Sequence, residues 1–268
     1  MRVGSIDLDS TLGCGQVFRW RKEGDDWKGV LNGAEVRLHQ KGASIVAEGG
    51  ISEGTVQRYF RSDDDLEHIR SEISKDQAMT AMVSNLPGLR LIRQDPWECA
   101  ASYVLATNAN IPRIQKMIEN VCRTFGDPLP EGGHRFPRPD QIAGGKEAAQ
   151  TCGLGFRCGR FVEFARMVDR GEIDLGSLRN VAYEECVREL RSYPGIGDKV
   201  ADCVAVFSLD HLEAFPVDVR IKKAMEEMYG VTGTYRHVNR YGRDYFGRYA
   251  GYAQEYIYYS FQRKNRFR

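Results

Sequence analysis

Two kinds of hydrophobic pattern divide the chain. Over the first fifty residues, apolar and polar positions nearly alternate in Val17–Arg21 and Trp27–Leu31, which is the spacing of half-buried strands. Asn32-Gly33 separates the second of these from Ala34–Leu38, and it favours a tight hairpin because both turn positions need positive φ. Ala43–Glu48 supplies a further strand. The N-terminal pattern therefore predicts an antiparallel sheet.

From about Ser62 onward the pattern becomes helical. Ser62-Asp63-Asp64-Asp65 is a predicted helix start, because carboxylates there lie near the positive end of the helix dipole. Asp95-Pro96 opens a predicted helix through Thr107, and Pro112 opens another that Gly126 ends. Two more helices are predicted over 161–170 and 181–191. We therefore expect an α+β protein with a sheet domain over 1–85 and a helical body over 86–268.

Composition narrows the class of protein. The chain has 268 residues, 42% of them hydrophobic, which suits an ordinary folded protein. It has no apolar stretch of about twenty residues, so no membrane span is expected, and MRVGSIDLDS lacks the pattern of a secretion signal. The seven cysteines are scattered without a CxxC pair, which favours reduced thiols inside a cell over disulfides or a metal cluster. The net charge of +1 does not by itself indicate a nucleic-acid binder.

The most specific pattern is a helix-hairpin-helix over about 182–208. A helix is predicted to end near Ser192, and Pro194-Gly195-Ile196-Gly197 follows before a second apolar helix begins. Two glycines two residues apart permit a tight turn with exposed backbone N–H groups, which can hold a phosphate at a helix start. An ordinary glycine-rich turn between helices is the alternative.

Lys199 and Asp218 are the candidate reactive groups. Lys199 stands in the first turn of the second helix, where the dipole disfavours an ammonium and leaves some neutral amine to form a Schiff base. Asp218 is placed to cap a helix running to Tyr229 and ended by Gly230. A carboxylate beside the amine would stabilise positive charge on a sugar. Taken singly, such a lysine is usually a solvated charge and such an aspartate only a cap.

These motifs resemble a known family. Pro194–Lys199, Val200–Cys203 and Pro216–Val219 are similar to the helix-hairpin-helix, Gly/Pro-Asp DNA glycosylases, and within them to the 8-oxoguanine DNA glycosylases. The resemblance spans nearly the whole chain, since further family motifs occur in order at 15–20, 93–96, 108–111, 154–157 and 249–251. It implies an antiparallel sheet domain followed by a two-lobed helical body with the active cleft between the lobes.

The resemblance implies the chemistry and the partner. Lys199 would attack C1′ of the nucleotide, with Asp218 as its electrostatic and proton-transfer partner, so that 8-oxoguanine is expelled and the strand is then cut by β-elimination. The substrate is duplex DNA carrying 8-oxoguanine, from which the damaged base must be rotated out. No cofactor is required, and a structural monovalent cation at the hairpin is left open. We expect a monomer. In a prokaryote it would be cytoplasmic and associated with the nucleoid, and in a eukaryote it would be nuclear.

The resemblance also assigns a base pocket. Gln254 and Tyr258 are four residues apart on one helix face, so an amide suited to a purine edge adjoins a flat ring suited to stacking. Cys203 would take the other side of the base, and the Gly15 carbonyl would accept the N7 hydrogen that distinguishes 8-oxoguanine from guanine. Without the resemblance, such residues are more often core. The DNA backbone would contact Gly195, Gly197, Val200 and Arg220.

The orphaned strand is assigned in the same way. Asn108, Arg113 and Arg157 would meet the partner cytosine, whose pairing edge suits arginine forks, and Phe156 would fill the vacated stack. The alternatives are that Asn108 only ends a helix, that Arg113 and Arg157 are solvated charges, and that Phe156 is a core side chain. The family pattern often has tyrosine at Phe156, phenylalanine at Tyr258 and histidine at Arg220. It also has three asparagines where this chain has Asn108-Ala109-Asn110, which bears on selectivity for cytosine.

Three other functions compete. A glycosylase for alkylated bases uses water and needs no lysine at the hairpin, so Lys199 argues against it. A relative of endonuclease III or of the adenine-removing enzymes would usually carry four clustered cysteines near its end, which this chain lacks. A non-catalytic DNA-binding module would use the hairpin alone, and the joint presence of Lys199, Asp218 and Gln254 weighs against it.

Overall fold

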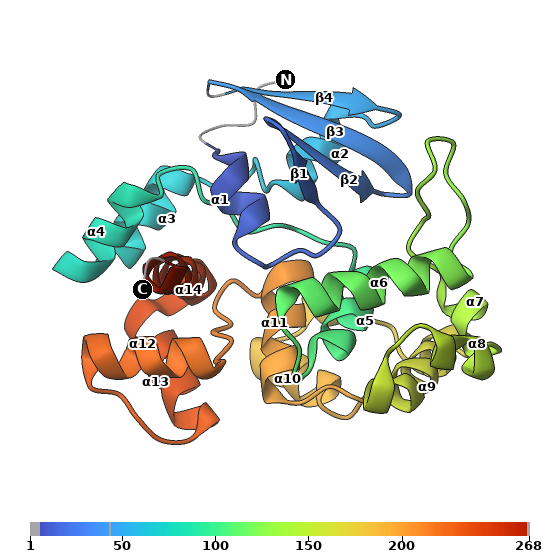
Figure 1. Ribbon diagram of the computed structural model, residues 1–268. Coiled ribbons are helices and arrows are strands. Elements are labelled where there is room, and N and C mark those ends of the chain that lie inside the picture. Colours follow the sequence, from blue (N-terminus) through green and yellow to red (C-terminus); the bar gives the residue numbers. More distant parts are fainter. Residues whose placement is uncertain (1–5, 43, 267–268) are drawn as a thin grey trace.

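The N-terminal part of the protein is a four-stranded antiparallel sheet (Figure 1). The computed structural model describes residues 6–42 and 44–266. The strands lie in sequence order and are β1 (Arg21–Glu23), β2 (Asp26–Leu31), β3 (Ala34–Lys41) and β4 (Ser44–Gly49). Asn32 and Gly33 have φ of 49° and 72°, so the predicted hairpin turn between β2 and β3 is confirmed.

Alternating burial gives the sheet one apolar face. Trp27 and Leu31 of β2 point into a core that Val36 and Leu38 of β3 complete, while their neighbours are more exposed. The helices α1 (Leu8–Gly13) and α2 (Glu53–Tyr59) contribute Leu8, Leu12, Val56 and Tyr59 to the same core. This core is separate from that of the helical body.

The predicted strand Val17–Arg21 is wrong except at Arg21, where β1 begins. Its apolar side chains serve two cores: Val17 and Trp20 pack under the sheet, whereas Phe18 packs into the helical body. The apparent alternation therefore reflects a segment between two cores rather than a paired strand. Ala43, the first residue of another predicted strand, lies outside the described residues, as do residues 1–5 of the stretch searched for a secretion signal.

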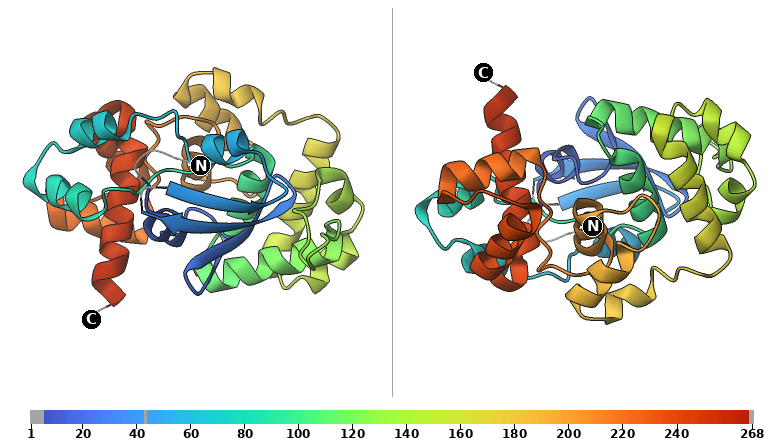
Figure 2. Two further views of the ribbon diagram at one scale, coloured as in Figure 1. Left: turned by 90° about the horizontal axis from the view of Figure 1, so that it is seen from above. Right: turned by 90° about the horizontal axis from the view of Figure 1, so that it is seen from below.

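The remaining chain forms two groups of helices (Figures 1 and 2). One group packs around α14 (Ala250–Arg266) and contains α3 (Leu66–Ile73), α4 (Gln77–Asn85), α12 (Val219–Tyr229) and α13 (Tyr235–Phe246). The other contains α5 (Pro96–Ala106), α6 (Ile111–Phe125), α7 (Pro139–Ala143), α8 (Lys146–Thr151), α9 (Cys158–Asp169), α10 (Tyr183–Leu190) and α11 (Asp198–Ser208). The α+β fold with a two-lobed helical body is thus confirmed.

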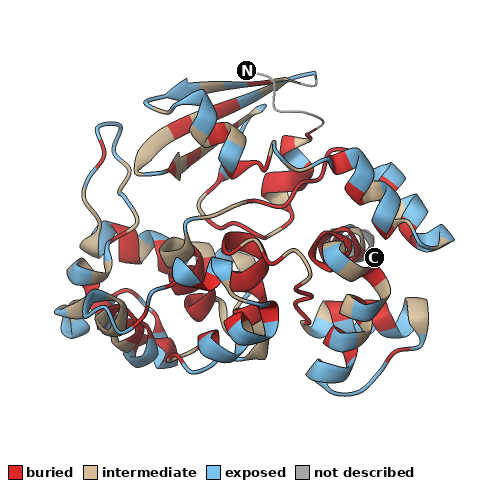
Figure 3. Ribbon diagram, turned by 180° about the vertical axis from the view of Figure 1, so that it is seen from behind, coloured by how far each residue is buried: buried red, intermediate tan, exposed pale blue. Residues whose placement is uncertain are grey.

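One apolar core runs through both helix groups, and buried positions gather in the middle of the molecule (Figure 3). The helices α3 and α4 fall inside the predicted 1–85 domain, yet Leu66, Ile69 and Met79 belong to this second core. The boundary at residue 85 stays a prediction. None of the described helices is both long enough and apolar enough to cross a lipid bilayer.

Aspartates begin several of these helices, as the sequence indicates. Asp95 accepts a hydrogen bond from the Glu98 N–H at 2.9 Å, and Asp65, the last aspartate of the predicted start at Ser62, caps α3 through the His68 N–H. Asp218 caps α12 in the same way, through the Ile221 N–H at 2.7 Å. Each helix start is therefore fixed by a local hydrogen bond.

A glycine contact sets the distance between the two helix groups. Gly251, in the first turn of α14, donates its N–H to the Leu212 carbonyl at 2.8 Å. A Cβ at Gly251 would lie 2.4 Å from Val206 Cγ2 and 3.0 Å from the Leu212 oxygen. Any side chain would therefore push α14 away from α11 and from the connection that leads to Asp218.

We predict that Gly251→Ala lowers the free energy of unfolding by about 1–3 kcal/mol, because the added methyl overpacks a backbone contact. Thermal or urea unfolding measures the change. Gly54→Ala is the matched control, since Gly54 also lies in the first turn of a helix but has open space around it. The control should leave stability unchanged or raise it by up to about 1 kcal/mol. Equal behaviour of the two variants would contradict the packing argument.

Candidate active site

The predicted helix-hairpin-helix is present, with α10 ending at Leu190 and α11 beginning at Asp198. Gly195 has a φ of +85°, and a Cβ on it would lie 3.0 Å from Val104 Cγ1 of α5. Glycine is needed there for both the left-handed backbone and the close approach. Arg191 and Asp198 flank the turn and form an ion pair at 2.7 Å. The hairpin is thus fixed against α5.

The hairpin leaves backbone donors free. Gly197 caps α11 without a side-chain hydrogen bond. Within the described part of the chain, the N–H groups of Gly195, Gly197 and Val200 have no hydrogen-bond acceptor. Unpaired N–H groups at the positive end of a helix dipole form a site suited to a phosphate. This placement matches the backbone-contact role predicted for these three residues.

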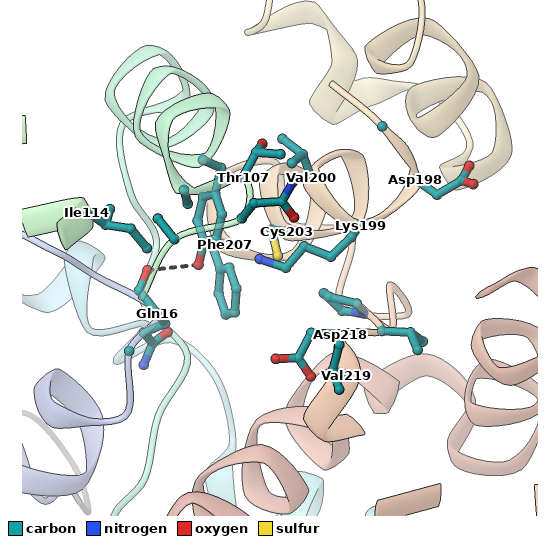
Figure 4. Close-up of a pocket in the computed structure, with 18 of the residues that line it drawn as sticks. Gln16, Thr107, Ile114, Asp198, Lys199, Val200, Cys203, Phe207, Asp218 and Val219 are labelled. Atoms are coloured by element: carbon teal, nitrogen blue, oxygen red, sulfur yellow. Dashed lines mark hydrogen bonds between the residues drawn. The ribbon is translucent and has the colours of Figure 1, made fainter. Parts of the chain in front are cut away.

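Lys199 and Asp218 line one cavity of about 890 Å³ (Figure 4). Lys199 is the second residue of α11, and Asp218 lies at the start of α12, so the two groups reach the cavity from different helices. Both side chains are half-buried. They line the same cavity but form no ion pair with each other in the described structure.

Apolar and weakly polar groups surround the lysine. Its Nζ lies 4.9 Å from the centre of the Tyr103 ring, which itself stacks on Phe207. Burial raises the pKa of Cys203 to about 11, and the nearby Lys199 ammonium opposes that rise. Cys203 is therefore a neutral thiol beside the amine at physiological pH. A half-buried amine that shares a cavity with a carboxylate is an arrangement suited to nucleophilic catalysis.

The four residues predicted to bind the base line the same cavity: Gly15, Cys203, Gln254 and Tyr258. Gln254 is 5% exposed, and its Oε1 has no hydrogen-bond partner in the described structure. A buried amide oxygen without a partner costs free energy unless a ligand supplies the donor. Because Gln254 also lines the cavity, its unpaired amide is suited to a polar ligand bound there.

Gly15 has a φ of +108°, and a Cβ on it would lie 2.8 Å from Ile111 Cδ1 and 3.9 Å from Tyr258 Cε1. Gly15 thus lines the cavity close to Ile111 and the Tyr258 ring, and the contact of its carbonyl with the base stays a prediction. The Arg220 guanidinium lies 4.6 Å from the centre of that ring. Arg220 therefore adjoins the base pocket, and its phosphate contact stays a prediction.

The residues assigned to the orphaned strand cluster near one another. Phe156 is 61% exposed, which is unusual for a large apolar side chain and agrees with a wedge that enters a base stack. Arg157 lies 4.3 Å from its ring centre and donates to the carbonyls of Thr107 and Asn108. Asn108 is exposed with a φ of +53°, and Arg113 is exposed at the start of α6.

Arg157 is the one member of this cluster that is buried. Burial and the nearby Arg113 charge lower the pKa of Arg157, and its guanidinium is occupied by backbone carbonyls. In this structure it fixes the turn that presents Asn108. Its predicted contact with the opposite base, like those of Asn108 and Arg113, stays a prediction.

Sequence reasoning missed several residues that line the cavity. Tyr103 and Phe207 carry no signal beyond the helical spacing of a core. Glu255 did carry one, because it is a second polar residue beside Gln254 in an otherwise apolar run. It is 2% exposed, and burial raises its pKa to about 7. Lys222, an exposed second lysine at the cavity, was also missed.

The chain is similar to known 8-oxoguanine glycosylases along nearly its whole length. A family model described as the N-terminal domain of 8-oxoguanine DNA glycosylase matches residues 1–100. The N-glycosylase/DNA lyase OGG1 of Arabidopsis thaliana is 29% identical, over 94% of this chain and 76% of its own. These matches cover the sheet domain and the helical body together.

Solved structures extend the likeness. The 8-oxoguanine glycosylase/lyase of Clostridium acetobutylicum, in complex with double-stranded DNA containing cytosine opposite 8-oxoguanine, superposes with a TM-score of 0.93. It is 30% identical, and the match covers 98% of this chain and 93% of that one. The 3-methyladenine DNA glycosylase of Archaeoglobus fulgidus shares the fold, with a TM-score of 0.80 at 21% identity, over 97% of this chain and 96% of that one.

Lys199 of the hairpin and the helix-capping Asp218 thus share a cavity with the buried Gln254, whose amide oxygen has no partner in the described structure. The chain also aligns with an 8-oxoguanine glycosylase/lyase over nearly its full length. The chain belongs to the 8-oxoguanine DNA glycosylase family of the helix-hairpin-helix, Gly/Pro-Asp superfamily.

Proposed function

We propose that this protein is a bifunctional DNA glycosylase and abasic-site lyase that removes 8-oxoguanine from duplex DNA. The observation that carries the proposal is the convergence of Lys199, Asp218 and Gln254 on one cavity, with an unpaired amide oxygen on Gln254 in the described structure. A purely DNA-binding module would need the hairpin but none of these three groups. A water-using glycosylase would need no amine in the cavity.

The first chemical step is attack by the Lys199 amine on C1′ of an extruded nucleotide. The bond between C1′ and the base breaks, and the base leaves with the electron pair and takes up a proton. The Asp218 carboxylate stabilises the positive charge that grows on the sugar, because it lines the cavity and has no ion-pair partner among the described residues. Opening of the sugar ring then gives an imine between Lys199 and C1′.

The imine makes the second step possible. It acidifies the hydrogen on C2′, and loss of that proton expels the 3′ phosphate, which is β-elimination. Water then hydrolyses the imine and frees Lys199. These steps draw on side chains of this chain, on the DNA and on water, so the proposal includes no cofactor. A monovalent cation at the hairpin stays a prediction.

The pocket accounts for the choice of base. The Gly15 carbonyl would accept the N7 hydrogen that 8-oxoguanine has and guanine lacks, and Gln254 would bind the pairing edge. The base would lie between Cys203 and Tyr258. Asn108, Arg113 and Arg157 would receive the orphaned cytosine, with Phe156 in the vacated stack.

Because the proposed substrate is chromosomal DNA, the enzyme would act at the nucleoid of a prokaryote or in a nucleus.

We predict that Lys199→Gln abolishes covalent trapping. Wild-type protein incubated with an 8-oxoguanine:cytosine duplex and borohydride should give a stable protein–DNA adduct, because borohydride reduces the imine. Lys222→Gln is the matched control, since Lys222 lines the same cavity from α12. The control should trap like the wild type. Trapping by Lys199→Gln, or its loss in Lys222→Gln alone, would assign the nucleophile elsewhere, and excision without trapping would favour the water-using branch.

We predict that Asp218→Asn slows base excision by about 100- to 1000-fold, because it removes one charge that acts on the transition state. Asparagine is as good an N-cap as aspartate, so the cap on α12 and the melting temperature should be kept. Single-turnover excision and circular dichroism measure the two effects. Asp65→Asn, the same change at the exposed N-cap of α3, controls for general effects. Wild-type turnover by Asp218→Asn would remove its assigned role.

We predict that Gln254→Ala narrows the difference in affinity between 8-oxoguanine and guanine duplexes by about 1–3 kcal/mol, the usual contribution of a good amide–base contact. The extruded 8-oxoguanine would lose that contact, whereas guanine, which has no N7 hydrogen for the Gly15 carbonyl, would stay in the stack and have no such contact to lose. Competition binding with the two duplexes measures it. Gln262→Ala is the control, because Gln262 is also buried on α14 with an unpaired oxygen but does not line the cavity. Unchanged discrimination by Gln254→Ala would contradict the pocket.

A further inference from the structure

One hydroxyl group connects the two segments that carry the reactive side chains. Tyr235 is the first residue of α13, and its O–H donates to the Asp202 carboxylate on α11. The same oxygen lies 3.2 Å from the carbonyl oxygen of Asp198, the residue before Lys199. It also accepts from the N–H of Val217, the residue before Asp218, at 3.4 Å. Tyr235 therefore contacts both neighbours of the reactive pair.

A second side chain of α13 makes a parallel connection. Asn239 follows Tyr235 by four residues and so shares its helix face. Its Nδ2 donates to Asp202 Oδ2 at 3.0 Å and to the carbonyl of Phe215 at 2.9 Å. Phe215 is in the segment that leads to Asp218. Two residues of α13 thus bind Asp202 on one side and residues 215–217 on the other.

Asp202 is held tightly enough to serve as an anchor. It is 1% exposed and accepts hydrogen bonds from Tyr183, Tyr235 and Asn239. Burial raises the pKa of Asp202 to about 6, and the two tyrosine hydroxyls oppose that rise by donating to the carboxylate. The group is therefore largely ionised at neutral pH, the state in which it accepts most hydrogen bonds.

We propose that Tyr235 and Asn239, anchored on Asp202, are positioning residues that set the distance and direction between Lys199 and Asp218. The two reactive groups lie in the first turns of different helices and form no direct ion pair, so their geometry depends on what joins those helices. Neither Tyr235 nor Asn239 is among the residues assigned above to the base or to the imine. The inference rests on the proposed function, since it concerns the same reaction.

The test is Tyr235→Phe, which removes only the hydroxyl. Single-turnover excision should fall about 10- to 100-fold, because a misplacement of about 1 Å costs as much as 100-fold in rate. The dissociation constant for the lesion duplex should change by less than about twofold, since the phosphate-binding N–H groups are untouched. A merely structural loss would change binding together with the rate.

Tyr229→Phe is the matched control. Tyr229 also donates its hydroxyl to an aspartate, Asp76, at 2.9 Å, but it does not line the cavity. Its loss should leave both the excision rate and the affinity near the wild type. Asn239→Ala tests the parallel connection independently, and it decides the matter if Tyr235→Phe does not fold. It should show the same split between rate and affinity.

The outcomes separate this inference from the proposed function. If the wild type neither excises 8-oxoguanine nor traps, the proposed function fails. If the wild type excises but the rates of Tyr235→Phe and Asn239→Ala stay within about twofold of it, the positioning role alone is overturned. An equal loss of rate in Tyr229→Phe, or a loss explained by weaker DNA binding, overturns it as well.

Discussion

The reaction depends on keeping two helix starts in a fixed relation. Lys199 belongs to α11 and Asp218 to α12, and the connection between the helices passes through Leu209–Val217. That connection contacts α14 through Gly251 and α13 through Asn239. A cavity between two helix groups can bind an extruded nucleotide, but it is rigid only if such contacts span it. The contacts of Gly251 and Asn239 therefore help to fix the two helix starts, together with the apolar core that runs through both helix groups.

Helix polarity is used differently at the two starts. Gly197 leaves the N-terminus of α11 uncapped, so its N–H groups stay available to a phosphate. Asp218 caps α12 with its own carboxylate, through the Ile221 N–H. The same hydrogen bond that begins α12 also holds the Asp218 carboxylate at the cavity. Asp218 thus serves both as the cap of α12 and as a carboxylate at the cavity.

Local signals in the sequence were sufficient for most of the fold. The turn at Asn32-Gly33, the caps at Asp95 and Asp218, and the hairpin around Gly195 all depend on backbone preferences within a few residues. Val17–Arg21 was mistaken for a strand because alternation does not tell two cores from two faces of a sheet. Lys199 and Asp218 were found through the hairpin motif, and Gly15 and Gln254 through the resemblance.

What the sequence did not predict depends on contacts between distant segments. Tyr235 acts through residues 18 and 33 positions away, and no spacing rule joins it to Val217 or Asp202. Asp202 looks like an ordinary helix position until three donors are seen around it. Such groups can be recognised only once the chain is folded, since their signal is burial of charge rather than periodicity.

The polar groups buried near the cavity also lower the stability of the folded protein. Gln254 and Glu255 each have a side-chain oxygen without a partner in the described structure, on a helix that otherwise packs into the core. A bound purine would satisfy Gln254. Glu255 is different, because burial favours its neutral form up to a pKa of about 7, well above that of a solvated glutamate. As pH rises from the solvated pKa towards 7, the unfolded chain ionises while the folded chain does not, and folding becomes less favourable. A carboxyl that weakens the fold at neutral pH, beside the base pocket, is better explained by the demands of the site than by those of the core.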